Sequence, residues 1–153
     1  MIKELKINDF KLSNDKKITL ELLETKLRFK LPQLYRELLL KYNNFAINGS
    51  ELLFGYGFKL NGNNDLVVNN LELEKEKSKR DFKNMPFNIV PIMPNGDGSL
   101  WALNYNDLNK YNEPKVYYLE LELSKIDSDT DFKYLSEYFD SFEDFVNYLN
   151  SDE

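Results

Sequence analysis

Two stretches near the start of the chain carry leucine and tyrosine at the spacing of a single helix face. The first predicted helix begins at Ile18, and its apolar positions follow at i, i+3 and i+7: Leu20, Leu23 and Leu27. A break at Leu31-Pro32 ends it, and Pro32 opens a second helix, since proline is tolerated where the helix N–H lacks a partner anyway. The apolar face of this second helix is Tyr35, Leu38, Leu39 and Tyr42. We predict that it ends near Asn43-Asn44, because asparagine adopts left-handed backbone angles readily.

The next part of the chain switches to short apolar runs between glycine- and asparagine-rich stretches, which is typical of strands joined by turns. We predict one or two strands within residues 45–64, with turns at Asn48-Gly49 and Asn61-Gly62. Residues 66–83 instead carry glutamate and lysine at i, i+3 spacing, which favours an exposed helix.

A glycine-rich segment at residues 95–99 separates two apolar runs, residues 89–94 and 100–105, and this arrangement predicts a β-hairpin. Pro91 and Pro94 cannot donate a hydrogen bond to a neighbouring strand. We therefore expect the first strand of the hairpin to lie at a sheet edge or to carry a bulge.

The C-terminal part predicts a strand and a closing helix. Residues 116–123 end in alternating apolar and acidic positions, so we expect one face of the strand to be exposed to solvent at this end. The helix begins at Ser141, with which Asp144 completes a Ser-x-x-Asp capping box. Its apolar face must pack on a sheet or on another helix and consists of Phe142, Phe145, Val146 and Leu149. At the other end of the chain, residues 1–17 are expected to form an N-terminal arm.

The composition removes several classes of enzyme chemistry. The 153 residues are 42% hydrophobic and 30% charged, the balance of one soluble domain with its own core, and no repeat or linker divides them. Cysteine and histidine are both absent, which excludes disulfides, Cys or His metal ligands, thiolate nucleophiles and Ser-His pairs. We expect a protein that is not an enzyme and that holds no metal and no cofactor. A hydrolase with two carboxylates stays open, although no pair stands out.

The charge is negative and unevenly distributed. Residues 120–153 hold 11 acidic and two basic residues, so this segment contributes −9 to a net charge of −6 and the remainder contributes +3. A negative protein is poorly suited to grip phosphate backbones, so direct nucleic-acid binding is disfavoured. The charged start of the chain does not resemble a signal peptide, and no apolar stretch approaches the ~20 residues of a membrane span. We therefore expect a cytoplasmic protein that does not bind a membrane.

Four segments, in this order, carry a resemblance to a known family. Residues 31–45 read LPQLYRELLLKYNNF, residues 91–92 with 96–105 read PI and GDGSLWALNY, residues 116–118 read VYY, and residues 141–145 read SFEDF. These segments resemble the LPxxYxxFLxxxNG element, the PI…GDGxxxxLDY hairpin, the VYYY strand and the SFxxFL helix of the SUKH superfamily. That superfamily includes the fungal Smi/Knr cell wall assembly regulator and many bacterial immunity proteins.

The resemblance implies a single α+β domain over residues 18–150, with a largely antiparallel β-sheet flanked by helices. It also implies a protein-binding module, in bacteria most often an antidote that occupies a polymorphic toxin. Three positions depart from the family pattern: Asn44 replaces a glycine, Asn104 an aspartate, and Leu119-Glu120 a His-Glu pair. No polar site built on that aspartate and histidine is therefore carried over to this chain.

Two candidate sites near the hairpin have a simpler structural interpretation. Asn95, Asp97 and Gly98 fit positions 3, 5 and 6 of a calcium-binding EF-hand loop, but the acidic first ligand and the final glutamate are missing. We interpret this segment as a turn whose glycines supply positive φ. Trp101 is the only tryptophan, and we favour core packing over a role as an exposed partner anchor.

The acidic residues of the C-terminal quarter are the feature of the composition that bears most directly on function. Either its acids form a solubilising surface, or their field steers a basic partner such as a nuclease toxin, whose cleft must attract phosphates. For the second interpretation, the expected partner-binding residues are acids, joined by one tyrosine from the irregular segment 109–114: Asp127, Asp129, Asp131, Glu137, Asp140 and Tyr111.

We thus predict a non-catalytic immunity protein that binds and neutralises a basic toxin domain, such as that of a nuclease. The alternative is a regulatory adaptor of the Smi/Knr cell wall assembly type, unrelated to toxins.

Overall fold

The structure, a computed structural model, describes residues 4–12, 17–56, 58–60, 66–68, 88–94, 100–119 and 135–151. Its elements follow one another in the order β1 (Ile7–Leu12), α1 (Lys17–Leu27), α2 (Gln33–Lys41), β2 (Tyr42–Ile47), β3 (Ser50–Glu51), the 3₁₀ helix η1 (Phe54–Tyr56), β4 (Phe58–Leu60), β5 (Leu66–Val68), β6 (Ile89–Pro94), β7 (Leu100–Leu108), β8 (Pro114–Leu119), β9 (Leu135–Phe139) and α4 (Phe142–Asn150).

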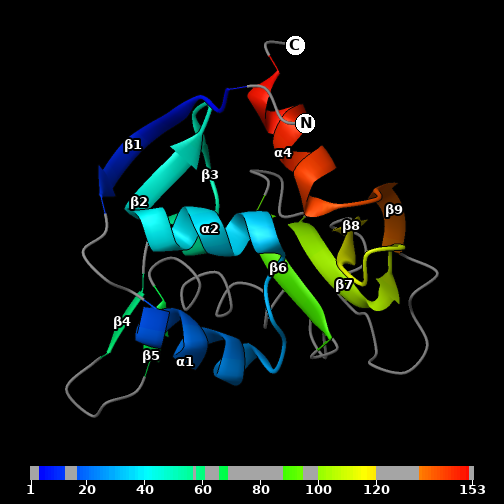
Figure 1. Cartoon of the computed structure of the whole chain (residues 1–153). Coiled ribbons are helices and arrows are strands. Elements are labelled where there is room, and N and C mark those ends of the chain that lie inside the picture. Colours follow the sequence, from blue (N-terminus) through cyan, green and yellow to red (C-terminus); the bar gives the residue numbers. More distant parts are fainter. Residues whose placement is uncertain are drawn as a thin grey trace.

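The strands form antiparallel sheets, and the fold is α+β as predicted. The larger sheets have the strand orders β1-β2-β3 and β6-β7-β8-β9, and β4 pairs with β5 in a two-stranded ribbon. Figure 1 shows the two larger sheets on opposite sides of the molecule, with α2 across its middle and α4 above the four-stranded sheet. None of the helices in the described part of the chain is long and apolar enough to span a membrane.

The core lies where α2 and α4 meet the sheets. The faces predicted for the two helices are buried, namely Tyr35, Leu38 and Leu39 of α2 and Phe142, Phe145, Val146 and Leu149 of α4. The ring of Tyr35 stacks on that of Phe142, with centroids 4.5 Å apart. The 3.6-residue period therefore identified the inward faces of both helices.

The predicted boundaries of the second helix are wrong at both ends. Pro32 occupies the N-cap position and not the first helical position, and the helix ends at Lys41. Tyr42 is already extended, and Asn43 and Asn44 belong to β2, where Asn44 pairs with Lys11 of β1. The pairing with β1 keeps Asn44 extended, although asparagine favours turns.

Two further predicted regions compare with the structure as follows. Residues 45–64, predicted to hold one or two strands, contain the end of β2 and the short strands β3 and β4, and between β3 and β4 Leu52 and Leu53 are buried and a 3₁₀ helix begins at Phe54. The predicted helix over residues 66–83 starts as strand β5, because Leu66–Val68 pairs with β4. The remainder of that predicted helix and the turn at Asn61-Gly62 lie outside the described residues.

The predicted hairpins are confirmed. Asn48 and Gly49 connect β2 to β3 with φ angles of 49° and 84°, a two-residue turn that asparagine and glycine tolerate. β6 pairs with β7, lies at the edge of its sheet and shifts register between Pro91 and Met93, as expected from its prolines. The connecting segment 95–99 lies outside the described residues, and so does the calcium-like pattern in it.

Part of the expected N-terminal arm is ordered in the sheet. Ile7–Leu12 forms β1 and pairs antiparallel with β2. Further on, β8 covers the first half of the strand predicted for residues 116–123, and residues 120–123 lie outside the described part.

Candidate functional site

Aromatic side chains gather at the surface where β7, β8 and β9 meet α4. We call Trp101, Tyr118, Tyr138, Phe139 and Tyr148 the aromatic patch. The ring centroid of Trp101 lies 5.0 Å from that of Tyr118, 5.1 Å from that of Tyr138 and 6.2 Å from that of Tyr148. Tyr138 is 60% exposed and Tyr148 is 52% exposed, whereas Trp101 is 7% exposed. The patch thus offers two tyrosine rings to solvent above a nearly buried tryptophan.

A bulge in β9 explains why two consecutive residues contact the same tryptophan. Val116 of β8 pairs with Phe139, but Tyr117 pairs with Glu137, so Tyr138 is an extra residue in β9. Such a bulge breaks the usual alternation of side chains between the two faces of a sheet. Tyr138 and Phe139 can therefore both reach Trp101, with ring centroids 5.1 and 5.7 Å from it.

The buried side of the patch is rigid. Phe145 of α4 is fully buried, and its ring centroid lies 5.4 Å from that of Trp101 and 5.6 Å from that of Phe139. Aromatic rings on a packed base lose little conformational entropy when a partner covers them. The exposed tyrosines are accordingly suited to binding another protein.

A surface hollow of about 340 Å³ lies beside Trp101. Its lining combines two aromatic rings, two aliphatic side chains and three small polar side chains: Trp101, Tyr148, Met93, Leu149, Asn48, Ser50 and Ser151. The hollow therefore joins the aromatic patch to the C-terminal end of α4 and to the β2–β3 turn.

Hydrogen bonds hold the walls of this hollow in place. The Asn48 side-chain amide donates to the main-chain oxygens of Leu149 and Ser151, each over 3.0 Å. The Asn48 N–H donates to the main-chain oxygen of Lys6 over 2.6 Å. The Lys6 N–H in turn donates to the side chain of Asn150 over 2.7 Å. The turn, the end of α4 and the chain before β1 therefore form one hydrogen-bonded unit.

The segment that carries β9 and α4 is strictly acidic. Residues 135–151 contain no lysine or arginine, and their four acids are Glu137, Asp140, Glu143 and Asp144. Glu143 and Asp144 lie in the first turn of α4, where the helix dipole favours negative charge. The Asp144 N–H donates to the Ser141 hydroxyl over 3.0 Å, so the predicted capping serine is confirmed.

The structure places the predicted partner-binding residues as follows. Asp127, Asp129 and Asp131 lie outside the described residues. Glu137 lies in β9 opposite Tyr117, and Asp140 is exposed directly after that strand.

Asp140 is linked to the segment that carries Tyr111. The buried side chain of Asn109 donates to the main-chain oxygen of Asp140 over 2.9 Å and accepts from the Tyr111 N–H over 2.8 Å. Tyr111 itself is 71% exposed, and the Lys110 ammonium lies 5.1 Å from its ring centroid. Two of the predicted residues are therefore brought to one part of the surface by a buried asparagine.

Sequence reasoning missed the exposed tyrosines of the patch. The prediction that Trp101 packs in the core is confirmed, yet part of its ring also lines the hollow. Tyr148 lies outside the periodic apolar face of α4, and this irregularity was the signal that could have identified it. Tyr138 gave no such signal, because its orientation depends on the bulge in β9.

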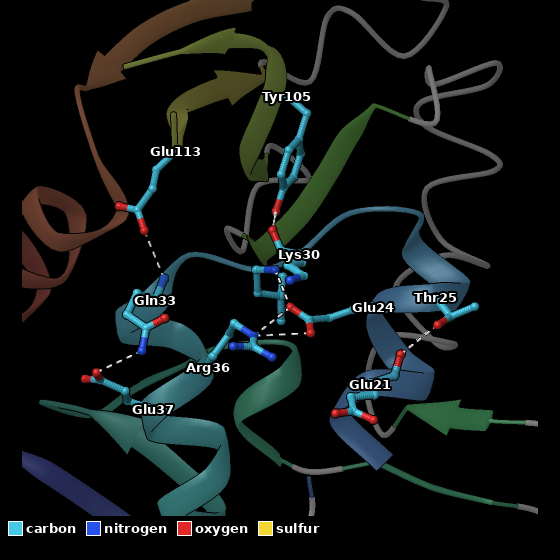
Figure 2. Close-up of polar contacts among 10 residues, drawn as sticks. Glu21, Glu24, Thr25, Lys30, Gln33, Arg36, Glu37, Tyr105 and Glu113 are labelled. Carbon is cyan, nitrogen blue, oxygen red and sulfur yellow. Dashed lines mark hydrogen bonds and ion pairs between the residues drawn. The ribbon is translucent and has the colours of Figure 1, made fainter. Parts of the chain in front are cut away.

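A second cluster of polar residues lies at the link between α1 and α2, and it is structural (Figure 2). The carboxylate of Glu24 is buried, accepts the Leu31 N–H over 2.6 Å and binds the Arg36 guanidinium over 2.9 Å. The Tyr105 hydroxyl donates to the main-chain oxygen of Lys30 over 2.6 Å. The polar main-chain groups where the helix is interrupted, at Lys30 and Leu31, thus have hydrogen-bond partners within the protein.

Tyr105 is a neutral donor in this cluster. Burial, reinforced by the negative charges of Glu24 and Glu113, raises the pKa of Tyr105 above that of an exposed tyrosine. Glu113 directly precedes β8, and its side chain reaches the start of α2, where the carboxylate accepts the Gln33 N–H over 2.9 Å. The cluster therefore joins the α1–α2 link to β7 and to the segment that leads into β8.

Among the residues whose burial the structure describes, Glu24 is the only buried acid, so they contain no converging pair of buried carboxylates of the kind a hydrolase would need. In the same part of the chain, no three acidic side chains gather as metal ligands would.

Comparison with known families gives a match over most of the chain. Residues 18–146 match the family model SUKH_6, which is described as SMI1-KNR4 cell-wall. The matched range contains all four segments of the family pattern, and it also contains Trp101 and Tyr138 of the aromatic patch. No curated protein matches the chain.

Proposed function

Because this chain belongs to the SUKH superfamily, within its SMI1-KNR4 family, we propose that it is a non-catalytic immunity protein that binds and neutralises a toxin. The observation that carries the proposal is the aromatic patch beside an acidic segment. Tyr138 and Tyr148 are exposed above Trp101, and residues 135–151 supply four acids and no base.

The patch has the properties of a protein-binding hot spot. Tryptophan, tyrosine and arginine dominate the energetics of protein interfaces, and such residues act best where neighbouring contacts exclude water. Tyr138 and Tyr148 each contact Trp101, which itself packs on Phe145. These rings supply the buried anchors that a surface of acids alone would lack.

The acids determine which partner is favoured. A negative field accelerates encounter with a positive partner and rejects negative ones. A nuclease toxin has a positive cleft because it must attract phosphates, so blocking that cleft is a task for an acidic protein. We include the predicted residues Asp127, Asp129, Asp131, Glu137 and Asp140 in this acidic surface, with Tyr111 as a contact at its edge.

The proposal is tested by growth rescue. A toxin that copurifies with the chain from its native cells is expressed in a host together with the wild-type chain or with the Tyr138→Ala/Tyr148→Ala variant. We expect the wild type to restore growth and the double variant to fail while remaining folded. Leu22→Ala removes an exposed leucine of α1 (41% exposed) and serves as the matched control. Full rescue by the double variant would contradict the proposal.

The second candidate is a regulatory adaptor of the Smi/Knr type, favoured by the cell-wall description of the matching family. An adaptor would use the same patch to bind a partner that is not toxic. Expression of the copurified partner alone distinguishes the two, because only a toxin stops the growth of a host that lacks this chain.

A further inference from the structure

We propose that the hollow beside Trp101 is a socket for one arginine side chain of the protein partner. The proposal rests on the function proposed above and adds the chemistry that this surface recognises. It is carried by the lining of the hollow, by the charge around it and by the hydrogen-bonding state of its polar groups.

The lining suits a long side chain with an apolar stem and a flat charged end. Met93 and Leu149 offer aliphatic contact to the stem, and the rings of Trp101 and Tyr148 offer aromatic faces or edges to the end group. A guanidinium stacks on aromatic rings more readily than an ammonium does, because it is planar and weakly hydrated. The hollow, at about 340 Å³, has room for such a side chain.

The electrostatic setting favours a cation. The hollow lies at the C-terminal end of α4, which is the negative end of the helix dipole, and α4 has no basic residue in its last turn. The four acids of residues 135–151 lie in β9 and up to the first turn of α4, so they act on the hollow only at longer range. An anionic ligand would meet an unfavourable potential at this end of the helix.

The polar side chains of the hollow present acceptors. The Nδ2 of Asn48 is committed to the oxygens of Leu149 and Ser151, so its Oδ1 is the part of the amide that can accept a hydrogen bond. The Ser151 hydroxyl donates to the main-chain oxygen of Tyr148 over 2.7 Å, which leaves its lone pairs as acceptors. A guanidinium has five N–H donors and no acceptor, so it complements these groups.

The test uses Trp101 as its own reporter, because it is the only tryptophan of the chain and lines the hollow. The full chain is titrated with the peptide acetyl-Gly-Arg-Gly-amide while Trp101 fluorescence and the NMR shift of its indole N–H are recorded. The matched peptide contains citrulline, which has the shape of arginine but no charge. We expect saturable changes with arginine and at least tenfold weaker binding with citrulline. Equal responses to the two peptides, or no saturable response to arginine, would overturn the proposal.

Two variants locate the binding. Tyr148→Leu removes an aromatic wall of the hollow and keeps an apolar side chain, and we expect it to weaken arginine-peptide binding at least fivefold. Leu22→Ala changes an exposed leucine of α1 that does not line the hollow, and we expect it to leave peptide binding within twofold. Circular dichroism verifies that both variants are folded. Equal losses in both would contradict the assignment to the hollow.

The outcomes separate this proposal from the broader one. If the arginine peptide fails to bind while the Tyr138→Ala/Tyr148→Ala variant loses toxin neutralisation, the socket is wrong and the immunity function stands. If the peptide binds at the hollow and the copurified partner proves harmless to cells, the socket stands and the toxin assignment is wrong.

Discussion

The ring of Tyr35 in α2 lies parallel to that of Phe142 in α4, with centroids 4.5 Å apart and an angle of 6° between the planes. Both side chains are fully buried, although 107 positions separate them in the sequence. This stack joins a helix of the N-terminal part to the closing helix. The aromatic patch is therefore built on a helix that the rest of the fold holds in place.

Truncation of Phe145 should destabilise the whole domain. The Phe145 ring is fully buried and contacts those of Trp101, Phe139 and Phe142. Phe145→Ala should lower the free energy of unfolding by about 3–5 kcal/mol, because it removes the apolar contacts and leaves a cavity. Urea unfolding followed by circular dichroism measures the change. Asn147→Ala, on the exposed side of α4, should change stability by no more than about 0.5 kcal/mol; similar losses in both would show that the helix face is misassigned.

Removal of the Glu24 carboxylate should weaken the link between α1 and α2. Glu24→Ala leaves the buried Leu31 N–H without its acceptor and leaves Arg36 without its carboxylate. We expect a loss of about 1–3 kcal/mol in urea unfolding, as for a buried donor that loses its partner. Glu37→Ala removes an exposed carboxylate that accepts a hydrogen bond from Gln33 within α2, and its effect should stay below about 0.5 kcal/mol. A Glu24→Ala protein as stable as the wild type would refute this role.

The free energy of unfolding should fall as the solution becomes alkaline, because two tyrosines are buried in their neutral form. Burial raises the pKa of Tyr35 and of Tyr105 above the ordinary tyrosine value of 10.0. Both groups therefore contribute stability that is fully present below pH 10 and is lost as the pH rises above it, because the unfolded chain releases these protons first.

Urea unfolding between pH 8 and pH 11 measures this slope. Tyr105→Phe keeps the ring that stacks on Phe29 and removes the ionisable hydroxyl, so the loss of stability above pH 10 should become shallower than in the wild type. Tyr111→Phe provides the comparison, because Tyr111 is 71% exposed. Identical slopes for wild type and Tyr105→Phe would contradict the prediction.

Reversal of the predicted acidic residues should slow association with the partner. The triple variant Asp127→Lys, Asp129→Lys, Asp131→Lys changes the charge of the acidic quarter by +6. We expect a lower association rate and a weaker dependence of that rate on salt, with little change in unfolding, because charge complementarity acts mainly on encounter.

Stopped-flow or surface plasmon resonance measurements at several ionic strengths test this expectation. A second triple variant, Glu72→Lys, Glu74→Lys and Glu76→Lys, changes the net charge equally outside the acidic quarter. If both variants slow association to the same extent, only net charge matters. An unchanged rate in the first variant would remove these three aspartates from the binding surface.

The sequence was sufficient for features that depend on neighbouring residues. The spacing of apolar residues identified the inward faces of α2 and α4. Asn48-Gly49 identified a tight turn, and the two prolines of residues 89–94 identified an edge strand. Four short segments in order identified the family. These features follow from local backbone preferences and from the need to bury apolar side chains, both of which can be read along the chain.

Contacts between distant residues decided the rest. Asn44 is extended because β1 pairs with it, and Tyr138 faces Trp101 because β9 carries a bulge opposite β8. The hollow exists because Asn48 binds the end of α4 about 100 positions later. The spacing of apolar residues along a helix or strand determines which of its faces each residue occupies. Whether that face is covered or open depends on elements that the chain places there only when it folds.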